Sequence, residues 1–260
     1  MAVRRLQAPH ISKKIQSDKV RLDVLLVERG LAPSREKAQA LLLAGQVRVD
    51  GQPATKPGTQ LFRKAAIDIV GNTLRYVGRG GLKLEGALED FQLPPQGRVC
   101  LDVGSSTGGF TDCLLQNDAA RVYAVDVTAA QLDWKLRQDA RVIPVERNAR
   151  YLKPSDIPDS PSFITADVSF ISVSKILPAI ASVAAPAADC LILIKPQFEL
   201  EKRKIGKGGI VRDPVLHDEA VGRVTESAKQ CGFDVIGVRP SRVPGAKGNL
   251  EFFLHARKRE

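Results

Sequence analysis

The stretch that decides the fold reads Asp102-Val103-Gly104-Ser105-Ser106-Thr107-Gly108-Gly109-Phe110. It follows the apolar run 99–101 and leads into a helical pattern over 110–115, which predicts a strand, a glycine turn and the start of a helix. Gly104 permits a sharp turn or a positive φ, and Gly108 and Gly109 let a ligand approach the backbone. Because the first N–H groups of a helix are free, the turn offers a site to a carboxylate or a phosphate.

A second apolar run, 121–125, ends at Asp126, which lies 22 positions after Gly104. A doubly wound α/β fold places at this distance the carboxylate that holds ribose hydroxyls. A glycine turn alone also fits an ordinary strand-to-helix connection without a ligand, but the spacing to Asp126 favours a nucleoside cofactor. The turn is neither the G-x-G-x-x-G of most NAD-binding proteins nor the GxxxxGK[ST] of a phosphate-binding loop.

The spelling Asp-x-Gly-x-x-x-Gly-Gly-Phe resembles the first motif of S-adenosylmethionine-dependent methyltransferases, in particular the FtsJ-like RNA 2'-O-methyltransferases. The resemblance implies an α/β fold with a doubly wound, Rossmann-like methyltransferase sheet. It also implies S-adenosylmethionine as the cofactor.

Length and charge predict an enzyme with a small basic appendage. The 260 residues suit one core domain of about 170 to 180 residues and a module of about 60. The net charge of +10 is concentrated in residues 1–80, where 15 Lys and Arg face 6 Asp and Glu, which predicts a polyanionic partner, nucleic acid ahead of an anionic membrane. We expect four segments: a basic tail 1–20, an RNA-binding α+β module 21–70, a glycine-rich linker 71–81 and a catalytic domain 82–260.

The N-terminal module reads as helix, helix and hairpin. Helical spacing predicts one helix over 21–30 and a second from an N-cap at Ser34 to Gly45, before a hairpin over 46–52 and a strand at 67–70. The string R-L-D-x-x-L-x-x-x-G-L-A-x-S-R-x-x-A-x-x-L-x-x-x-G-x-V-x-V-x-G resembles the alpha-L RNA-binding domain first described in a small-subunit ribosomal protein. Each basic side chain also fits a solvated surface, but together they predict an RNA-binding set: Arg21, Arg35, Lys37 and Arg48, with Arg75 and Arg79 from the linker.

Four charged residues fall at related places of the expected sheet. Asp167 and Lys195 each end an apolar strand, Lys83 begins the helix before the first strand, and Glu251 starts a late strand. Methyl transfer to a hydroxyl requires removal of a proton, and both the apolar run 191–194 and the charge of Lys83 favour a neutral Lys195 that acts as the base. The carboxylates would orient the lysines. A lone lysine after a strand commonly reaches into solvent, but the four together predict a catalytic set.

The chain from about Arg21 to Leu254 resembles the TlyA family through the strings S-S-T-G-G-F-T-D, D-V-S-F-I-S, K-P-Q-F-E, G-G-I-V and G-x-x-G-N-x-E-F. This family joins an alpha-L module to an FtsJ-like domain and is described as 16S/23S rRNA (cytidine-2'-O)-methyltransferase, or as hemolysin A. The resemblance implies ribosomal RNA or ribosomal subunits as the partner, and Lys83, Asp167, Lys195 and Glu251 as catalytic residues. The residues that it implies for the cofactor are Asp102, Gly104, Ser105, Gly108, Gly109, Phe110, Asp126 and Asn148. It also suggests that Arg75-Tyr76-Val77 is an interdomain element that some relatives spell with Trp.

Two other functions remain open at this point, a membrane-active hemolysin and a non-catalytic RNA-binding protein. The stretch 176–194 is interrupted by two prolines and an aspartate, so we expect no membrane span, and residues 1–20 lack the apolar region of a secretory signal. The four cysteines show no CxxC spacing, which predicts core residues of a reducing compartment and no metal site. We therefore expect a cytoplasmic enzyme without an obligate protein partner.

Overall fold

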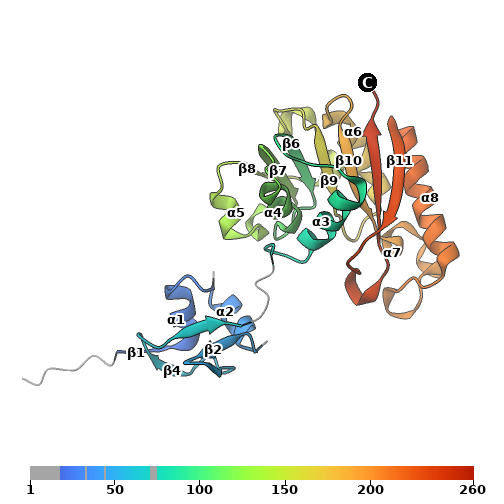
Figure 1. Cartoon of the computed structure of the whole chain (residues 1–260). Coiled ribbons are helices and arrows are strands. Elements are labelled where there is room, and N and C mark those ends of the chain that lie inside the picture. Colours follow the sequence, from blue (N-terminus) through green and yellow to red (C-terminus); the bar gives the residue numbers. More distant parts are fainter. Residues whose placement is uncertain (1–17, 33, 44, 71–74) are drawn as a thin grey trace, which may run out of the picture. The chain divides into compact units, whose positions relative to one another are not determined.

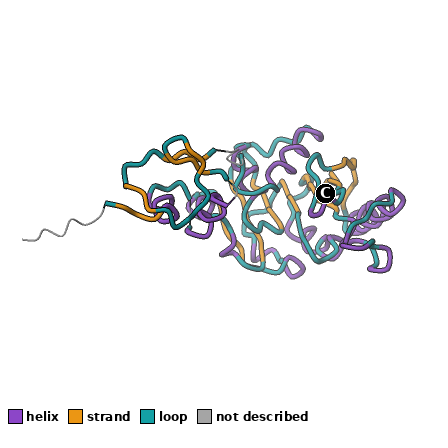
Figure 2. Tube along the Cα trace, turned by 90° about the horizontal axis from the view of Figure 1, so that it is seen from below, coloured by secondary structure: helices purple, strands orange, loops and turns teal. Residues whose placement is uncertain are grey.

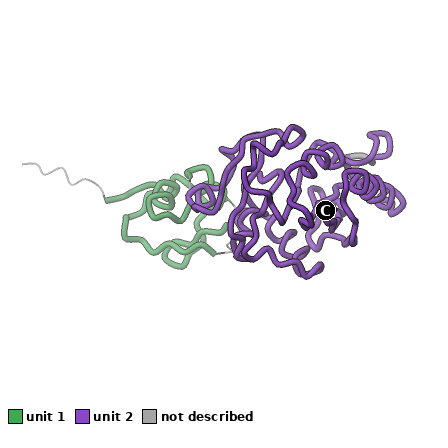
Figure 3. The backbone as a smooth tube through the Cα atoms, turned by 90° about the horizontal axis from the view of Figure 1, so that it is seen from above, with its two compact units in different colours: residues 1–73 green, residues 74–260 purple. Residues whose placement is uncertain are grey.

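The computed structural model describes residues 18–32, 34–43, 45–70 and 75–260 of the chain. These residues form two compact units, which divide between residues 73 and 74 (Figure 1, Figure 3). The predicted tail lies outside the described residues as far as residue 17. Each unit has its own hydrophobic core, and each is described by itself below.

The first unit packs two short helices, α1 (Leu22–Glu28) and α2 (Arg35–Leu43), against short antiparallel strands. One sheet has the order β3 (Gln52–Pro53), β2 (Val47–Val49) and β5 (Ile67–Ile69), and its Asp50-Gly51 turn has positive φ at both residues, as the predicted hairpin requires. The helices, the loop between them and β2 supply the core, which consists of Leu22, Leu26, Ala32, Ala38, Leu42 and Val47.

The N-terminal boundary of this unit differs from the sequence expectation. Lys19 and Val20, which we assigned to the tail, belong to β1 (Lys19–Arg21), and β1 pairs antiparallel with β4 (Gln60–Phe62). Neither strand is predicted by the sequence, because three residues are too few to show an alternating pattern. The first helix is also shorter than the predicted 21–30, since β1 occupies Arg21.

The second unit is built on a seven-stranded sheet in the order β11-β12-β10-β9-β6-β7-β8. The strands β6 (Val99–Val103), β7 (Arg121–Asp126), β8 (Val142–Glu146), β9 (Phe163–Ala166) and β10 (Asp189–Ile194) are parallel. The last strand, β12 (Phe252–Lys258), runs antiparallel between β10 and β11 (Phe233–Pro240). The doubly wound α/β fold class is therefore confirmed.

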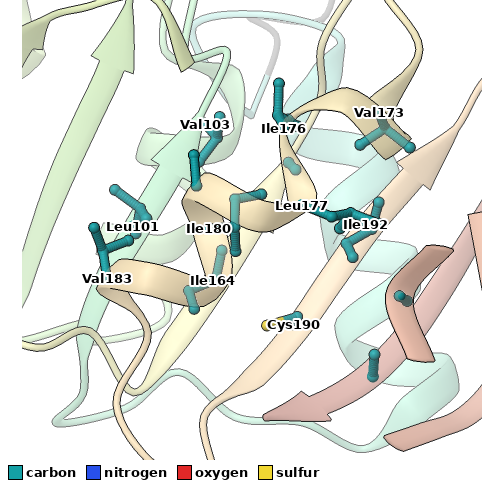
Figure 4. Packing of buried hydrophobic residues seen from close by; sticks show 14 of the residues in the cluster. Leu101, Val103, Ile164, Val173, Ile176, Leu177, Ile180, Val183, Cys190 and Ile192 are labelled. Carbon is teal, nitrogen blue, oxygen red and sulfur yellow. The ribbon is translucent and has the colours of Figure 1, made fainter. Parts of the chain in front are cut away.

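Helices cover both faces of this sheet (Figure 2). On one face α6 (Leu177–Val183) and α8 (Pro214–Gln230) pack over a cluster that includes Leu101, Ile164 and Ile192 (Figure 4). On the other face lie α3 (Gly80–Phe91), α4 (Gly109–Gln116) and α5 (Trp134–Gln138), while the single turn α7 (Pro196–Glu199) follows β10 directly. Because both faces are covered, the parallel strands are apolar on both sides.

The predicted linker 71–81 is wrong in its second half, and its first part, 71–74, lies outside the described residues. Tyr76 is 1% exposed and belongs to the core cluster of α3 and α4. Gly80 and Gly81 already form the first turn of α3. A glycine-rich composition suggested a tether here, but the glycines serve close packing within the second unit.

Candidate active site

The glycine turn sits at the carboxyl end of β6, where the backbone N–H groups of Gly104 and Ser105 both donate to the Val125 carbonyl oxygen, at 2.8 and 3.0 Å. Gly104 has φ +87°, and a Cβ atom at this position would collide with the backbone oxygen of Asp167. Only glycine suits both conditions. The turn therefore places β6, β7 and β9 in contact at one edge of the sheet.

Asp126 ends β7 beside this turn, and its carboxylate accepts hydrogen bonds from the backbone N–H groups of Ser106 (2.9 Å) and Thr128 (3.3 Å). It lines a cavity of about 500 Å³. The cavity is bounded by the ends of β6 to β9 and the loops that follow them, and its wall includes Gly104, Val127, Gln131, Arg147, Asn148, Val168, Phe170 and Ile176.

A second cavity of about 200 Å³ lies on the other side of the glycine turn. It shares Gly104, Ser106, Asp167 and Ser169 with the larger cavity, so the two meet at the turn. The remaining wall comes from the starts of α3 and α4 and from the end of β10, namely Gly78, Arg79, Gly80, Ser105, Thr107, Gly109, Phe110 and Lys195.

Six of the eight predicted cofactor residues line one or both cavities: Gly104, Ser105, Gly109, Phe110, Asp126 and Asn148. The other two line neither cavity, and their part in cofactor binding stays a prediction. Gly108 caps α4 with a positive φ, and a side chain there would collide with Leu136 in the core, while Asp102 is fully buried beneath the turn.

Asp102 supports the turn from inside the sheet. Its carboxyl group accepts hydrogen bonds from the hydroxyls of Thr111 on α4 (2.6 Å) and Thr165 on β9 (3.2 Å). Burial raises the pKa of Asp102 to about 7, against the lowering effect of these two hydroxyls. Asp102 thus links β6, α4 and β9.

The four predicted catalytic residues form two ion pairs at the same edge of the sheet. Lys83 Nζ lies 2.6 Å from Glu251 Oε2, and Lys195 Nζ pairs with Asp167 Oδ1. Lys195 Nζ also donates to the hydroxyl of Ser169 at 2.8 Å. All four side chains are largely buried, so the pairs are only weakly screened by water.

Strand register explains why the two pairs are neighbours. Ile194 on β10 faces Phe252 on β12, so Lys195 after β10 and Glu251 before β12 follow directly at the same end of this ladder. Glu251 precedes the late strand and does not start it, a small correction to the sequence expectation. Each lysine has its own carboxylate, and this attraction opposes the repulsion between Lys83 and Lys195 that the sequence analysis emphasised.

The segment before α3 closes the smaller cavity. The Val77 N–H donates to Asp112 Oδ2 on α4 at 2.7 Å, and Tyr76 packs so closely on Gly81 that a Cβ there would overlap its ring. Gly109 at the start of α4 likewise has room only for hydrogen against the backbone of 78–81. Tight glycine contacts therefore hold the cofactor turn against the helix that carries Lys83.

The predicted RNA-binding residues lie in two places. In the first unit, Lys37 and Arg48 are exposed, and Arg21 and Arg35 both pair with the buried carboxylate of Asp23, at 3.0 and 3.1 Å. Burial opposes this charge, but the hydrogen bonds from Arg21, Gln39 and Arg35 outweigh it and hold the pKa of Asp23 well below its usual value. The other two residues belong to the second unit, where Arg75 pairs with Glu85 and Arg79 lines the smaller cavity.

Three residues of the site escaped the sequence analysis. Ser169 contacts Lys195, and Arg147 lines the larger cavity while its guanidinium holds Asp156 at 2.5 Å. Phe170 also lines that cavity, is 91% exposed and has φ +66°, which is uncommon for a residue with a side chain. The signals in the sequence are that Ser169 and Phe170 follow shortly after Asp167 at the end of a strand and belong to the family string D-V-S-F-I-S.

Among the described residues, no helix is both long and apolar enough to cross a membrane. The same residues contain no group of three or more His, Cys, Asp or Glu side chains arranged to hold a metal ion.

Comparisons with known proteins agree with this geometry. The model of the family FtsJ-like methyltransferase matches residues 76–258, and the S4 domain model matches residues 20–62. The chain is 47% identical over 92% of its length to the 16S/23S rRNA (cytidine-2'-O)-methyltransferase TlyA of Mycobacterium tuberculosis, of which it covers 90%. It is 42% identical over 91% of its length to Hemolysin A of Brachyspira hyodysenteriae, of which it covers 99%.

Solved structures give the same result. A Streptococcus thermophilus protein described as a hemolysin aligns with a TM-score of 0.72 and 44% identity, over 93% of this chain and 89% of that one. A methyltransferase from Mesorhizobium loti aligns over 70% of this chain at 14% identity with a TM-score of 0.53, which shows the fold alone. This chain therefore belongs to the TlyA family of FtsJ-like methyltransferases, as its glycine turn, its S4 domain and its relatives show.

Proposed function

We propose that this protein transfers a methyl group from S-adenosylmethionine to the ribose 2'-hydroxyl of a cytidine in 16S or 23S ribosomal RNA. The observation that carries the proposal is the pair of buried lysine–carboxylate contacts beside a cavity in which Asp126 stands ready for a ribose. Relatives named as rRNA (cytidine-2'-O)-methyltransferases support the choice of substrate. We infer a cytoplasmic protein, because ribosomal RNA is its proposed substrate.

The residues of the two cavities fit S-adenosylmethionine. Asp126 can accept hydrogen bonds from both ribose hydroxyls, and Asn148 and Gln131 stand in the same wall. The smaller cavity has a wall of glycines, and a Cβ atom on Gly78 would come within 2.9 Å of Thr107 Oγ1. When bound, the cofactor supplies a methyl group on a positively charged sulfur, which is ready for attack by an oxygen nucleophile.

Proton transfer is assigned to Lys195. The Lys195 ammonium first releases a proton to solvent, and the amine then accepts the proton that the 2'-hydroxyl loses as its oxygen gains the methyl group. The resulting ammonium is stabilised by the Asp167 carboxylate and by the Ser169 hydroxyl, and it later releases the proton to solvent. Lys83 and Glu251 line neither cavity; they form a second, self-neutralised pair that fixes the start of α3 to the residue before β12 without adding net charge to the buried edge.

The substrate RNA is held by the first unit and by the rim of the cavity. Exposed Lys37 and Arg48, with the partly exposed guanidiniums of Arg21 and Arg35, offer contacts to phosphate. The exposed ring of Phe170 at the cavity offers a face on which an unpaired base can stack. Backbone contacts and stacking suit a nucleotide taken out of a structured RNA.

The decisive experiment maps 2'-O-methyl groups at nucleotide resolution in rRNA incubated with the purified protein and S-adenosylmethionine. We expect a new methyl group on one or a few cytidines with the wild type and none with Lys195→Ala. A protein that only binds RNA leaves the rRNA unmodified in both samples. Modification of a base instead of a ribose would contradict the assignment of the nucleophile.

A further inference from the structure

The loop 167–172 joins β9 to the turn that begins at Val173, and it carries much of the active site. Asp167 and Ser169 both contact the ammonium of Lys195, and residues 167–171 all line the larger cavity. Phe170 in its middle adopts a left-handed backbone conformation at φ +66°. Such a conformation costs free energy in a residue with a side chain, so the surrounding contacts must hold the loop in place.

The far end of this loop is fixed by Glu199. The Ser172 hydroxyl donates to Glu199 Oε2 at 2.5 Å, and the Val173 N–H donates to Oε1 at 2.8 Å. Val173 is the first residue of a short 3-10 helix, Val173–Lys175, whose first N–H groups have no partner within the helix. The Ser172 side chain makes no cap for this helix, so the carboxylate of Glu199 serves instead.

One short segment, 195–199, thus holds the loop at both ends. Lys195 contacts its beginning and Glu199 contacts its end, while the Phe198 ring lies 5.5 Å from the largely exposed ring of Phe170 between them. Only four positions separate Lys195 from Glu199, and α7 spans 196–199, so a single helical turn connects the two charged groups. The contacts at the Ser172 end of the loop are therefore coupled through this turn to those at Lys195.

The burial and the charged neighbours of Glu199 suit it to hold the loop 167–172. Glu199 is 8% exposed. Burial raises the pKa of its carboxyl group, and the hydrogen bonds from Ser172 and Val173 lower it. Lys175 and Arg223 are the cations that act on it, and the guanidinium of Arg223 also donates to the Glu199 carbonyl oxygen at 3.4 Å. The carboxyl group has no route to the substrate except through the loop, because it lines neither cavity.

We propose that Glu199 is a positioning residue for methyl transfer, which holds the loop 167–172 so that Asp167 and Ser169 stay on Lys195. This inference rests on the proposed function for its catalytic part. Its structural part, the anchoring of the loop, can be measured without any substrate.

The experiment compares Glu199→Ala and Glu199→Gln with the wild type in the full-length protein. Glutamine restores both hydrogen bonds, because its oxygen accepts from Val173 and its amide donates to Ser172. The control is Asp189→Asn, since Asp189 is a carboxylate of similar burial (6% exposed) at the opposite end of β10. Amide hydrogen exchange of peptide 167–173, the melting temperature, kcat and KM for rRNA are measured for all four proteins.

We expect Glu199→Ala to raise exchange in peptide 167–173 by about tenfold or more. Its kcat falls by about 10- to 100-fold at a temperature where it stays folded, and KM for rRNA stays unchanged. Glu199→Gln recovers most of the turnover. Asp189→Asn lowers the melting temperature but leaves kcat and the exchange of this peptide as in the wild type.

Three results would overturn the inference: normal kcat in Glu199→Ala despite faster exchange, a Glu199→Gln variant no better than Glu199→Ala, or a loss of kcat in Asp189→Asn that parallels its loss of stability. If the wild type methylates no rRNA, the proposed function fails. The exchange comparison still tests the anchor in that case, and unchanged exchange in Glu199→Ala would refute it independently.

Discussion

Charged side chains cluster at both ends of strand β10, but only one of the two clusters faces a cavity. At its beginning, the single carboxylate of Asp189 accepts hydrogen bonds from Arg98 (2.9 Å), His255 (3.0 Å) and Arg257 (3.0 Å). At its other end, the ammonium of Lys195 meets one carboxylate and one hydroxyl and also faces a cavity.

The two clusters differ in whether a charged group keeps hydrogen-bonding capacity for a ligand. Three donor groups surround Asp189, which lines neither of the cavities described above, so this cluster can contribute only to stability. Lys195 lines the smaller cavity and retains donor capacity for a ligand. A buried charge network becomes reactive where one of its members still borders open space.

The largest effect should come from Lys195. We expect Lys195→Ala to lower turnover by about 10²- to 10⁴-fold, because it removes the group that accepts the proton. Lys195→Arg should not restore turnover, since guanidinium keeps its proton at every working pH. Methyl transfer to rRNA is followed with labelled cofactor, and cofactor binding by calorimetry serves as the control for folding. Near-normal transfer by the arginine variant would show that Lys195 is only a positioning charge.

At the opposite end of the strand, Asp189→Asn should lower the free energy of unfolding by about 2 to 4 kcal/mol, because it leaves partly buried cations without their shared partner. Its turnover should equal that of the wild type. Burial alone would raise the pKa of Asp189, but the hydrogen bonds from His255, Arg98 and Arg257 outweigh it, so the pKa lies below its usual value. A lowered pKa stabilises the fold above about pH 4, the unfolded value, and this contribution is lost as the pH falls further. Denaturant titrations between pH 3 and 7 should show a smaller pH dependence in Asp189→Asn than in the wild type.

Glycines at the two ends of β6 allow the same comparison, since Gly104 follows the strand at the cavities and Gly97 precedes it. Gly104→Ala places a Cβ against the backbone of Asp167, so cofactor affinity should fall by about 30-fold or more. Gly97 before β6 has a similar positive φ of +69° but no atom within 4 Å of a Cβ, so Gly97→Ala should lose only about 1 kcal/mol of stability. Calorimetry with S-adenosylmethionine separates the two variants. Equal affinities would mean that the turn adapts to a side chain.

The smallest effect is expected in the first unit, where the carboxylate of Asp23 again holds two guanidiniums. Here the cations are partly exposed, 44% for Arg21 and 55% for Arg35, as is the 50% exposed Arg257 beside Asp189, so their guanidiniums can contact phosphate while they hold Asp23. Replacing both arginines by alanine should weaken rRNA binding and reduce the salt slope, log K against log salt, by about 2. Arg259→Ala, which breaks a surface pair with Asp234 in the second unit, is the matched control. An unchanged slope in the double variant would remove this cluster from the RNA interface.

The sequence predicts those parts of the molecule that depend on local pattern. The glycine turn, the acid at the end of β7 and the lysine at the end of β10 each follow an apolar strand, so their placement at one edge of the sheet follows from the fold class. The Asp-Gly turn of the first unit is equally local. The assignment of roles to these residues stays a prediction.

Long-range contacts escaped the sequence for a physical reason. Asp102 looks like a ligand residue by position, but two threonines from distant elements enclose it. Tyr76 lies in a glycine-rich segment, which normally indicates a tether, and its burial depends on the absence of a side chain at Gly81. Glu199 gains its partners 26 and 27 positions away, and no periodicity encodes such a contact.

The position of β12 has a consequence for how the enzyme becomes active. This strand follows all the other described strands in sequence, yet it lies inside the sheet, between β10 and β11. Until it inserts, β10 is an open edge of apolar residues, which is a template for aggregation. Glu251 immediately precedes this strand, 168 positions after its partner Lys83, so the pairing of β12 with β10 both covers that edge and brings the two charges together. A chain in which β12 is unpaired therefore lacks the Lys83–Glu251 ion pair, and the pair forms as the sheet closes.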